Sequence, residues 1–125
     1  MIPAGVDYVR AQTFEQAFEA LADPEAKALA GGQSLLPVLK LRVIRTSLLV
    51  DIGGLRPSGA KTEDGHITVS ALTTWDDLSR LPELDRTGPN SPGLAAVGEC
   101  TRGIGDLQVR NRGTLGGSLA HADPV

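Results

Sequence analysis

The sequence predicts a mixed fold of the α+β or α/β class, in which short helices alternate with short strands. Three observations support this class. Helix-start signals recur along the chain, apolar runs of strand length lie between them, and a stretch with proline and glycine at 57–59 divides the chain. A length of 125 residues fits one domain or two small subdomains. We predict two α+β subdomains, residues 1–56 and residues 57–125.

The first helix and the first strand are predicted from local signals. Thr13 and Gln16 have the spacing of a capping box, which predicts that a helix begins at residue 14. Apolar side chains then recur every three or four residues, and Asp23-Pro24 ends the helix. After it, Lys27–Ala30 is predicted to be a short buried strand that leads directly into a pair of glycines.

A second helix and a second strand complete the first predicted subdomain. Ser34 is the predicted N-cap of a helix over residues 35–42. Pro37 lies in the first turn of that helix, where backbone N–H groups have no partner within the helix. Residues 48–52 form an apolar run of strand length, and Gly53-Gly54 closes it with a turn.

The second subdomain begins with a predicted β-hairpin. Asp64-Gly65 is a dipeptide typical of hairpin turns, and residues 66–71 after it alternate as a half-buried strand does. The remaining predicted elements, in chain order, are a helix over 75–81 capped by Thr74 with Asp77, a loop over 82–92, a helix from Pro92 to about Thr101, and a short strand at Leu107–Val109.

Composition argues against several classes of function. The net charge of −3 and the aromatic content of 3% disfavour nucleic-acid binding, which depends on basic side chains and stacking platforms. The single cysteine, Cys100, excludes an internal disulfide and a multi-cysteine metal site. No apolar run approaches the length of a membrane span, and the N-terminus does not have the pattern of a signal peptide. We therefore expect a cytoplasmic protein without a membrane span.

Two glycine-rich loops are the most informative feature for function. They are Ala30-Gly31-Gly32-Gln33-Ser34 and Thr114-Leu115-Gly116-Gly117-Ser118. Glycine adopts conformations with positive φ and lets the backbone approach a ligand closely. Successive N–H groups in such turns form a concave anion-binding site. Two such loops predict a ligand with two linked phosphates, and a dinucleotide cofactor is the leading candidate.

Each of these features also has a purely structural interpretation. Gly31-Gly32 alone is most simply a turn, and Thr114–Ser118 alone fits a glycine-rich strand end equally well. Neither loop matches the phosphate-binding loop or the Rossmann fingerprint. His121 and Asp123 are more simply a structural pair than a catalytic or metal-binding one. Since the sequence offers no credible set of nucleophile, base and orienting group, any chemistry would belong to a cofactor.

The two loops and their flanking residues resemble one family closely. Residues 30–37, Ala-Gly-Gly-Gln-Ser-Leu-Leu-Pro, followed by Lys40-Leu41-Arg42, resemble the first flavin loop of the medium, FAD-binding subunit of carbon monoxide dehydrogenase. Residues 108–124 are similar to the second flavin loop of the same family. This family includes the flavin subunits and domains of molybdenum hydroxylases such as xanthine dehydrogenase. The resemblance covers nearly the whole chain.

The resemblance implies a p-cresol methylhydroxylase-type FAD-binding fold, in which FAD lies between two small α+β subdomains and both glycine loops bind its pyrophosphate. It also implies that the chain is truncated at its C-terminus, because family members continue well beyond residue 125. No catalytic side chain and no metal ligand is expected. The residues that the resemblance places at the cofactor are Leu29, Ala30, Gly31, Gly32, Gln33, Ser34, Leu35, Thr114, Leu115, Gly116, Gly117 and Ser118.

The function that the resemblance implies is that of an electron-transfer subunit. FAD passes electrons from iron–sulfur clusters to an external acceptor, while a separate molybdenum subunit oxidises the substrate. The implied partners are a molybdenum-binding large subunit and an iron–sulfur small subunit of a heterotrimer. Two alternatives stay open. One is a flavin reductase of the same fold, and the other is a truncated module that binds no cofactor and acts only through protein contacts.

Overall fold

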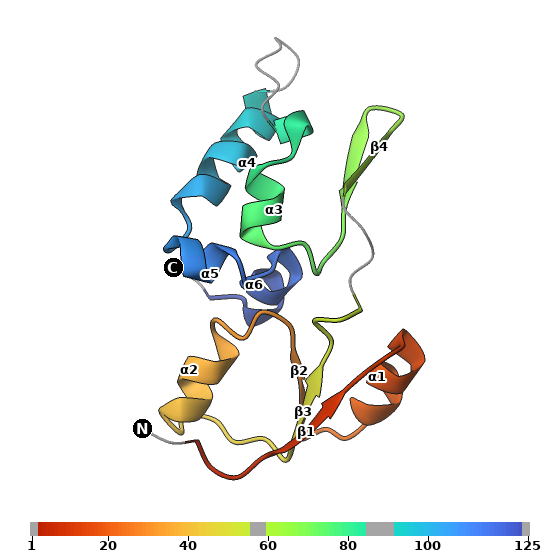
Figure 1. The fold of residues 1–125 in the computed structure, drawn as a ribbon, viewed down its shortest axis with the longest axis vertical. Helices are drawn as coiled ribbons and strands as arrows, with labels where there is room; N and C mark the ends of the chain where they lie inside the picture. Colours follow the sequence, from red (N-terminus) through yellow and green to blue (C-terminus); the bar gives the residue numbers. More distant parts are fainter. Residues whose placement is uncertain (1–2, 56–59, 85–91, 124–125) are drawn as a thin grey trace. The chain divides into compact units, whose positions relative to one another are not determined.

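The computed structural model describes residues 3–55, 60–84 and 92–123. Contacts divide the chain into two compact units, Met1–Arg56 and Pro57–Val125. The first unit is a parallel sheet with helices in its connections, and the second is a β-hairpin followed by a group of short helices (Figure 1). The predicted mixture of helices and strands is therefore confirmed, and the class is α+β.

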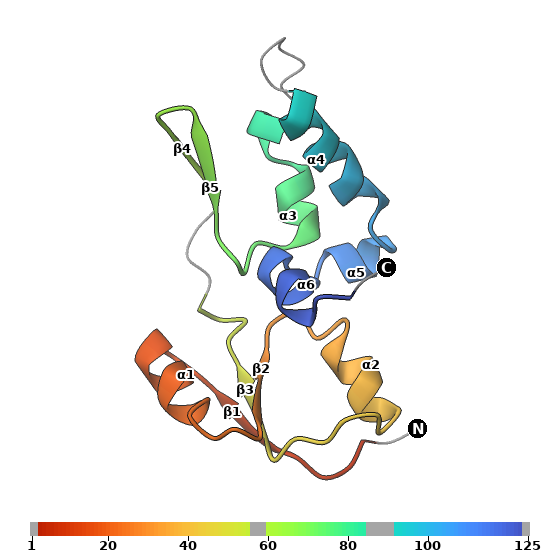
Figure 2. The same cartoon turned by 180° about the vertical axis from the view of Figure 1, so that it is seen from behind.

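The sheet of the first unit has three parallel strands in the order β1-β3-β2. They are β1 (Asp7–Arg10), β2 (Ala26–Leu29) and β3 (Leu48–Asp51). The last residues of the three strands are level with one another, because Asp51 pairs with both Arg10 and Leu29. The helices α1 (Phe14–Ala20) and α2 (Leu35–Lys40) lie on opposite sides of the strands in both views (Figures 1 and 2). The first glycine loop leaves the sheet at this carboxyl edge.

Small side chains form the core of the first unit. Val50 on the central strand is completely buried, and Ala11, Ala17 and Ala26 pack with it. The predicted capping box fixes the start of α1: the Thr13 hydroxyl accepts a hydrogen bond from the Gln16 N–H at 3.2 Å. The Gln16 side chain accepts from the N–H of Gln12, at 2.9 Å, rather than from that of Thr13.

Two predictions about the first unit need correction. The strand predicted as buried, Lys27–Ala30, begins one residue earlier, and Lys27 and Ala28 are exposed. The reason is that β2 is an edge strand of the sheet. The second helix ends at Lys40 rather than at Arg42. Arg42 adopts a left-handed conformation with φ 57°, and the Val43 N–H turns back to the Val38 carbonyl at 3.0 Å, which is the geometry of a Schellman helix end.

The second unit begins with the predicted hairpin, formed by β4 (Ala60–Glu63) and β5 (His66–Val69). Asp64 and Gly65 both have positive φ, 50° and 77°, which is the conformation of a type I′ turn. The helical elements that follow are α3 (Trp75–Ser79), the 3-10 helix η1 (Pro82–Leu84), α4 (Pro92–Gly103), α5 (Leu107–Arg110) and α6 (Leu115–His121). Within the loop predicted over 82–92, residues 85–91 lie outside the described residues.

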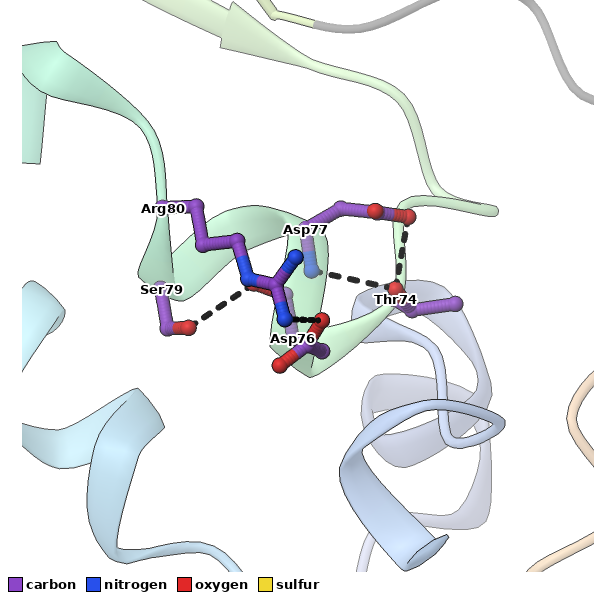
Figure 3. A network of polar contacts seen from close by, with 5 residues as sticks. All are labelled: Thr74, Asp76, Asp77, Ser79 and Arg80. Carbon is purple, nitrogen blue, oxygen red and sulfur yellow. Dashed lines mark hydrogen bonds and ion pairs between the residues drawn. The ribbon is translucent and has the colours of Figure 1, made fainter. Parts of the chain in front are cut away.

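A polar network fixes the start of α3 (Figure 3). The Thr74 hydroxyl accepts from the Asp77 N–H at 3.2 Å and donates to the Asp77 carboxylate at 2.6 Å. Asp76 pairs with Arg80 one turn later at 2.8 Å. The predicted cap is therefore confirmed, and the helix is two residues shorter than predicted. Gly98 of α4 is buried against η1, where an added Cβ would lie 2.9 Å from the Leu84 carbonyl oxygen.

The strand predicted at Leu107–Val109 is wrong, because these residues form the short helix α5. Asp106 is the N-cap, and its carboxylate accepts from the Val109 N–H at 2.8 Å. Arg110 then donates to the carbonyl oxygens of Ile104 and Gly105 at 3.1 and 2.9 Å. These bonds close the segment into a compact turn of helix. The alternation of Leu107, Gln108 and Val109, on which the predicted strand is based, does not reveal them.

Candidate functional site

The first glycine loop follows the last residue of β2 at the carboxyl edge of the sheet. The Leu29 carbonyl accepts from the Ile52 N–H at 3.0 Å, and the chain then leaves the sheet. Gly32 has φ 75°, a conformation that other residues adopt only with strain. A Cβ at Gly32 would also lie 3.0 Å from the Leu36 Cδ1 and 3.3 Å from the Leu29 Cδ1. Position 32 therefore requires glycine for conformation and for space.

Five consecutive backbone donors of this loop have no partner among the described residues. The N–H groups of Gly31, Gly32, Gln33, Ser34 and Leu35 make no hydrogen bond within the described part of the chain. Ser34 is the N-cap residue of α2 as predicted, but its side chain makes no capping hydrogen bond. The first hydrogen bond back into the loop runs from the Leu36 N–H to the Gly32 carbonyl at 3.1 Å. Unpaired N–H groups in series are the donor set that an anion requires.

The second glycine loop has a different structure, because it is the first turn of α6. Thr114 is the N-cap, and its hydroxyl accepts from the Gly117 N–H at 3.1 Å. Thr114 is buried and forms an isolated antiparallel bridge with Thr74, the N-cap of α3. The hydrogen bonds of this bridge run from the Trp75 N–H to the Gly113 carbonyl and from the Leu115 N–H to the Thr73 carbonyl, both at 3.0 Å, and they hold the starts of the two helices together.

Most backbone donors of the second loop are already used within the protein. The N–H groups of Leu115 and Gly116 donate to the Thr73 and Ala71 carbonyls at 3.0 and 2.7 Å. Those of Gly117 and Ser118 donate to the hydroxyl and the carbonyl of Thr114, both at 3.1 Å. The Thr114 N–H and the Ser118 hydroxyl make no hydrogen bond among the residues that the structure describes. These two groups are the donors that remain for a ligand.

Packing also explains the glycines of the second loop. A Cβ at Gly116 would lie 2.7 Å from the Ala71 Cβ and 2.8 Å from the Ala71 carbonyl oxygen. A Cβ at Gly117 would lie 2.7 Å from the Thr114 hydroxyl oxygen that caps the helix. The Gly116 contacts include backbone atoms of Ala71, so a side chain is excluded there, whereas the Gly117 contact is with the Thr114 hydroxyl alone. Gly116 therefore has a structural reason that does not depend on a ligand.

The other candidates from the sequence do not assemble into a reactive site. The His121 Nε2 lies 3.8 Å from the Asp123 carboxylate, and both side chains are largely exposed. Among the described residues, no group of three or more His, Cys, Asp or Glu side chains could hold a metal ion. None of the described helices has the length and apolar character of a membrane span.

One contact next to the first loop has no signal in the sequence. The Tyr8 hydroxyl donates to the Asp51 carboxylate at 2.5 Å, across 43 positions of sequence. This hydrogen bond raises the pKa of the Tyr8 phenol above its ordinary value, because the phenolate would lose the bond and face a negative charge. A carboxylate at a strand end followed by Gly53-Gly54 is a local signal for a turn, but the sequence does not indicate the tyrosine.

Comparisons with known proteins agree on one family. A family model described as the FAD binding domain in molybdopterin dehydrogenase matches residues 4–125. The chain is 44% identical over 128 residues to the 6-hydroxypseudooxynicotine dehydrogenase complex subunit alpha of Paenarthrobacter nicotinovorans, covering 98% of this chain and 40% of that protein. It is 37% identical over 127 residues to the glyceraldehyde dehydrogenase medium chain of Sulfolobus acidocaldarius, covering 100% and 43%.

Solved structures give the same result. A chain of the carbon monoxide dehydrogenase from Hydrogenophaga pseudoflava matches with a TM-score of 0.86 and 37% identity, over 99% of this chain and 42% of that one. A chain of quinoline 2-oxidoreductase from Pseudomonas putida 86 matches with a TM-score of 0.81 and 32% identity, over 98% and 42%. The chain thus spans about two fifths of the length of these relatives.

Proposed function

Because the chain belongs to the family of FAD-binding domains in molybdopterin dehydrogenases, we propose that it is the FAD-binding part of an electron-transfer subunit in a molybdenum-containing hydroxylase. Bound FAD supplies the redox chemistry, and the protein binds and orients it. The proposed route runs from iron–sulfur clusters through FAD to an external acceptor in the cytoplasm. The proposed partners are a molybdenum-binding large subunit and an iron–sulfur small subunit. The relatives named as a complex subunit and as a medium chain support an assembly of several chains.

The unpaired N–H groups of the first loop support the proposal that its residues bind FAD. The pyrophosphate of FAD is anionic and has several acceptor oxygens. The five unpaired donors of Gly31–Leu35 fit that chemistry. Gly31, Gly32 and Leu35 are half-buried, and Gln33 and Ser34 are exposed. We propose that these N–H groups bind the pyrophosphate, while Leu29 and Ala30 attach the loop to the sheet.

For the second loop we propose a more restricted role than the one that the resemblance implies. Its N–H groups from Leu115 to Ser118 are engaged within the protein, so Thr114–Gly117 serve mainly to fix the start of α6. The Ser118 hydroxyl is exposed and without a partner in the described residues, and the Thr114 N–H is also unpaired. We propose that these two groups supply this loop's contacts with the cofactor.

A flavin-loading experiment tests the proposed function. The purified chain is incubated with excess FAD, passed over a desalting column, and scanned for the visible absorption bands of protein-bound flavin. We expect retained flavin at a ratio approaching one per chain. A colourless protein that shows no FAD binding in a direct titration contradicts the proposal and favours the module without a cofactor.

A second experiment tests the proposed partners. The chain is tagged in its native host and purified under mild conditions, and the eluate is analysed for molybdenum and iron and for co-purifying polypeptides. We expect both metals, each carried by a partner chain, because the described residues of this chain contain no group that could hold a metal. Recovery of the flavin-loaded chain without either metal contradicts the proposed assembly and leaves the FAD assignment standing.

A further inference from the structure

Asp51 is the last residue of the central strand, and both oxygens of its carboxylate are engaged. One oxygen, Oδ1, accepts from the Gly53 N–H at 2.8 Å. The other, Oδ2, accepts from the Tyr8 hydroxyl at 2.5 Å. The first bond folds the chain into a turn directly after β3, and the second ties that turn to the neighbouring strand β1. Hydrogen bonds to an ionised carboxylate are stronger than those between neutral groups.

The turn that Asp51 holds lies against the base of the first glycine loop. The Ile52 N–H donates to the Leu29 carbonyl at 3.0 Å, two residues before the loop glycines. A Cβ built on Gly53 would lie 3.1 Å from the Asp51 Oδ1 and 3.6 Å from the Ala30 carbonyl oxygen. Ala30 immediately precedes Gly31. The backbone at Ile52 and Gly53 therefore supports the loop at the point where it leaves the sheet.

The loop depends on this support because its own backbone bonds are few. The N–H groups of Gly31–Leu35 make no hydrogen bond in the described part of the protein. The bonds recorded within the loop are a long contact of 3.3 Å from the Gln33 side chain to the Gly31 carbonyl and the bond from Leu36 to Gly32. Because its N–H groups stay free for a ligand, the conformation of this loop must be fixed by the residues at its two ends.

We propose that Asp51 is a positioning residue for the first glycine loop. Its carboxylate fixes the turn at Ile52 and Gly53, and the Tyr8 hydroxyl fixes the carboxylate. The Ile52 N–H bonds the Leu29 carbonyl at the base of the loop. Asp51 acts through the backbone of Ile52 and Leu29 and does not itself bind the cofactor. This inference rests on the proposed function of the loop as the site of the FAD pyrophosphate.

Asp23 provides a matched control in the same unit. Its Oδ1 accepts from the N–H two residues later, that of Glu25, at 2.9 Å. Its Oδ2 accepts from the Ser47 hydroxyl of a distant segment at 3.1 Å. Both carboxylates thus accept from the N–H two residues later and from a distant hydroxyl, and Asp51 has a further interaction besides. Asp23 and Ser47 precede β2 and β3, whereas Asp51 ends β3. Removing Asp23 removes a comparable pair of bonds at the amino end of the sheet, away from the glycine loop.

The test compares FAD and ADP binding by the wild-type chain and four variants, Asp51→Ala, Asp51→Asn, Tyr8→Phe and Asp23→Ala. We expect Asp51→Ala, which removes the bonds to the Gly53 N–H and the Tyr8 hydroxyl, to raise the Kd of both ligands about tenfold. We expect a smaller rise, about threefold in the Kd of each ligand, for Asp51→Asn and for Tyr8→Phe. Asp51→Asn keeps an acceptor for the Gly53 N–H. Asp23→Ala is expected to leave both Kd values within about twofold of wild type, despite a similar fall in melting temperature.

A second readout separates positioning from general loss of stability. In the chain without ligand, the backbone amide signals of Gly31 and Gly32 should move in Asp51→Ala and stay in place in Asp23→Ala. If Asp51→Ala does not fold, Asp51→Asn and Tyr8→Phe decide by the same two readouts. Wild-type affinity in these Asp51 variants, or an equal loss in Asp23→Ala, overturns the inference while the proposed function stands. A wild-type chain that binds no FAD overturns both.

Discussion

Replacing Gly32 with alanine separates the cofactor role of the first loop from the cost of an unusual backbone conformation. Gly32 has φ 75° and Gly65, in the β-hairpin turn, has φ 77°. Alanine at a left-handed position costs about 1–2 kcal/mol, so the conformational penalty is the same at both sites. The Gly65 site is open, with nothing within 4 Å of an added Cβ. Gly65→Ala is therefore the control for strain alone.

The contacts of an added Cβ make the Gly32 site the more sensitive one. The Cβ would lie 3.0 Å from the Leu36 Cδ1 and 3.3 Å from the Leu29 Cδ1, so both methyl groups must move by a few tenths of an ångström. Overpacking of this kind adds about 1 kcal/mol, which gives about 2–3 kcal/mol for Gly32→Ala against about 1–2 kcal/mol for Gly65→Ala. Relief of the strain changes the backbone dihedral angles at position 32 and so reorients the neighbouring N–H groups.

The assay is a thermal melt followed by circular dichroism, together with an FAD titration followed by flavin fluorescence. Both variants should melt at lower temperature than the wild type, and only Gly32→Ala should raise the FAD Kd, by at least about tenfold. The reasoning is refuted if the two variants lose FAD affinity equally, or if a folded Gly32→Ala variant binds FAD as the wild type does.

The remaining predictions concern packing and ionisation. Gly116→Ala should lower the free energy of unfolding by about 1–3 kcal/mol, because its Cβ would lie 2.7 Å from the Ala71 Cβ. Gly93→Ala, in open space on α4, should be neutral or stabilising by up to about 1 kcal/mol. Equal midpoints of urea unfolding for the two variants would contradict this. Tyr8 is the only tyrosine of the chain, so an ultraviolet titration reports its phenol directly. Its midpoint should lie above 10.0 and fall towards 10.0 in Asp51→Asn, and the stabilisation by its hydrogen bond should be present below pH 10 and disappear as the pH rises through the folded pKa. A wild-type midpoint at or below 10.0 would show that the bond is not formed in solution.

Signals that act over a few residues are the ones that the sequence conveys reliably. The caps at Thr13 and Thr74 and the turn at Asp64-Gly65 were predicted from spacing within four residues, and the structure confirms all three. The resemblance to the FAD-binding medium subunits also rests on contiguous motifs, and the family match confirms it. Short-range patterns are sufficient here because the interactions that they encode are themselves short-range.

Features that depend on distant partners are harder to predict from sequence, and one local feature also differs in part. Ser34 is the N-cap of α2, but its side chain makes no capping bond. Gly116 is predicted to be ligand-binding, and the Ala71 backbone also excludes a side chain there. The sequence shows that a glycine is present. It does not show whether a ligand or a neighbouring backbone excludes the side chain.

The most direct test of the account is an FAD titration of the isotopically labelled chain followed by backbone amide NMR. If the free N–H groups of the first loop bind the pyrophosphate, the amide signals of Gly31–Leu35 should show the largest shifts at saturation. The signals of Asp64 and Gly65 in the hairpin turn should remain in place and serve as the internal reference. Saturable FAD binding that leaves the signals of Gly31–Leu35 unmoved would contradict the central claim.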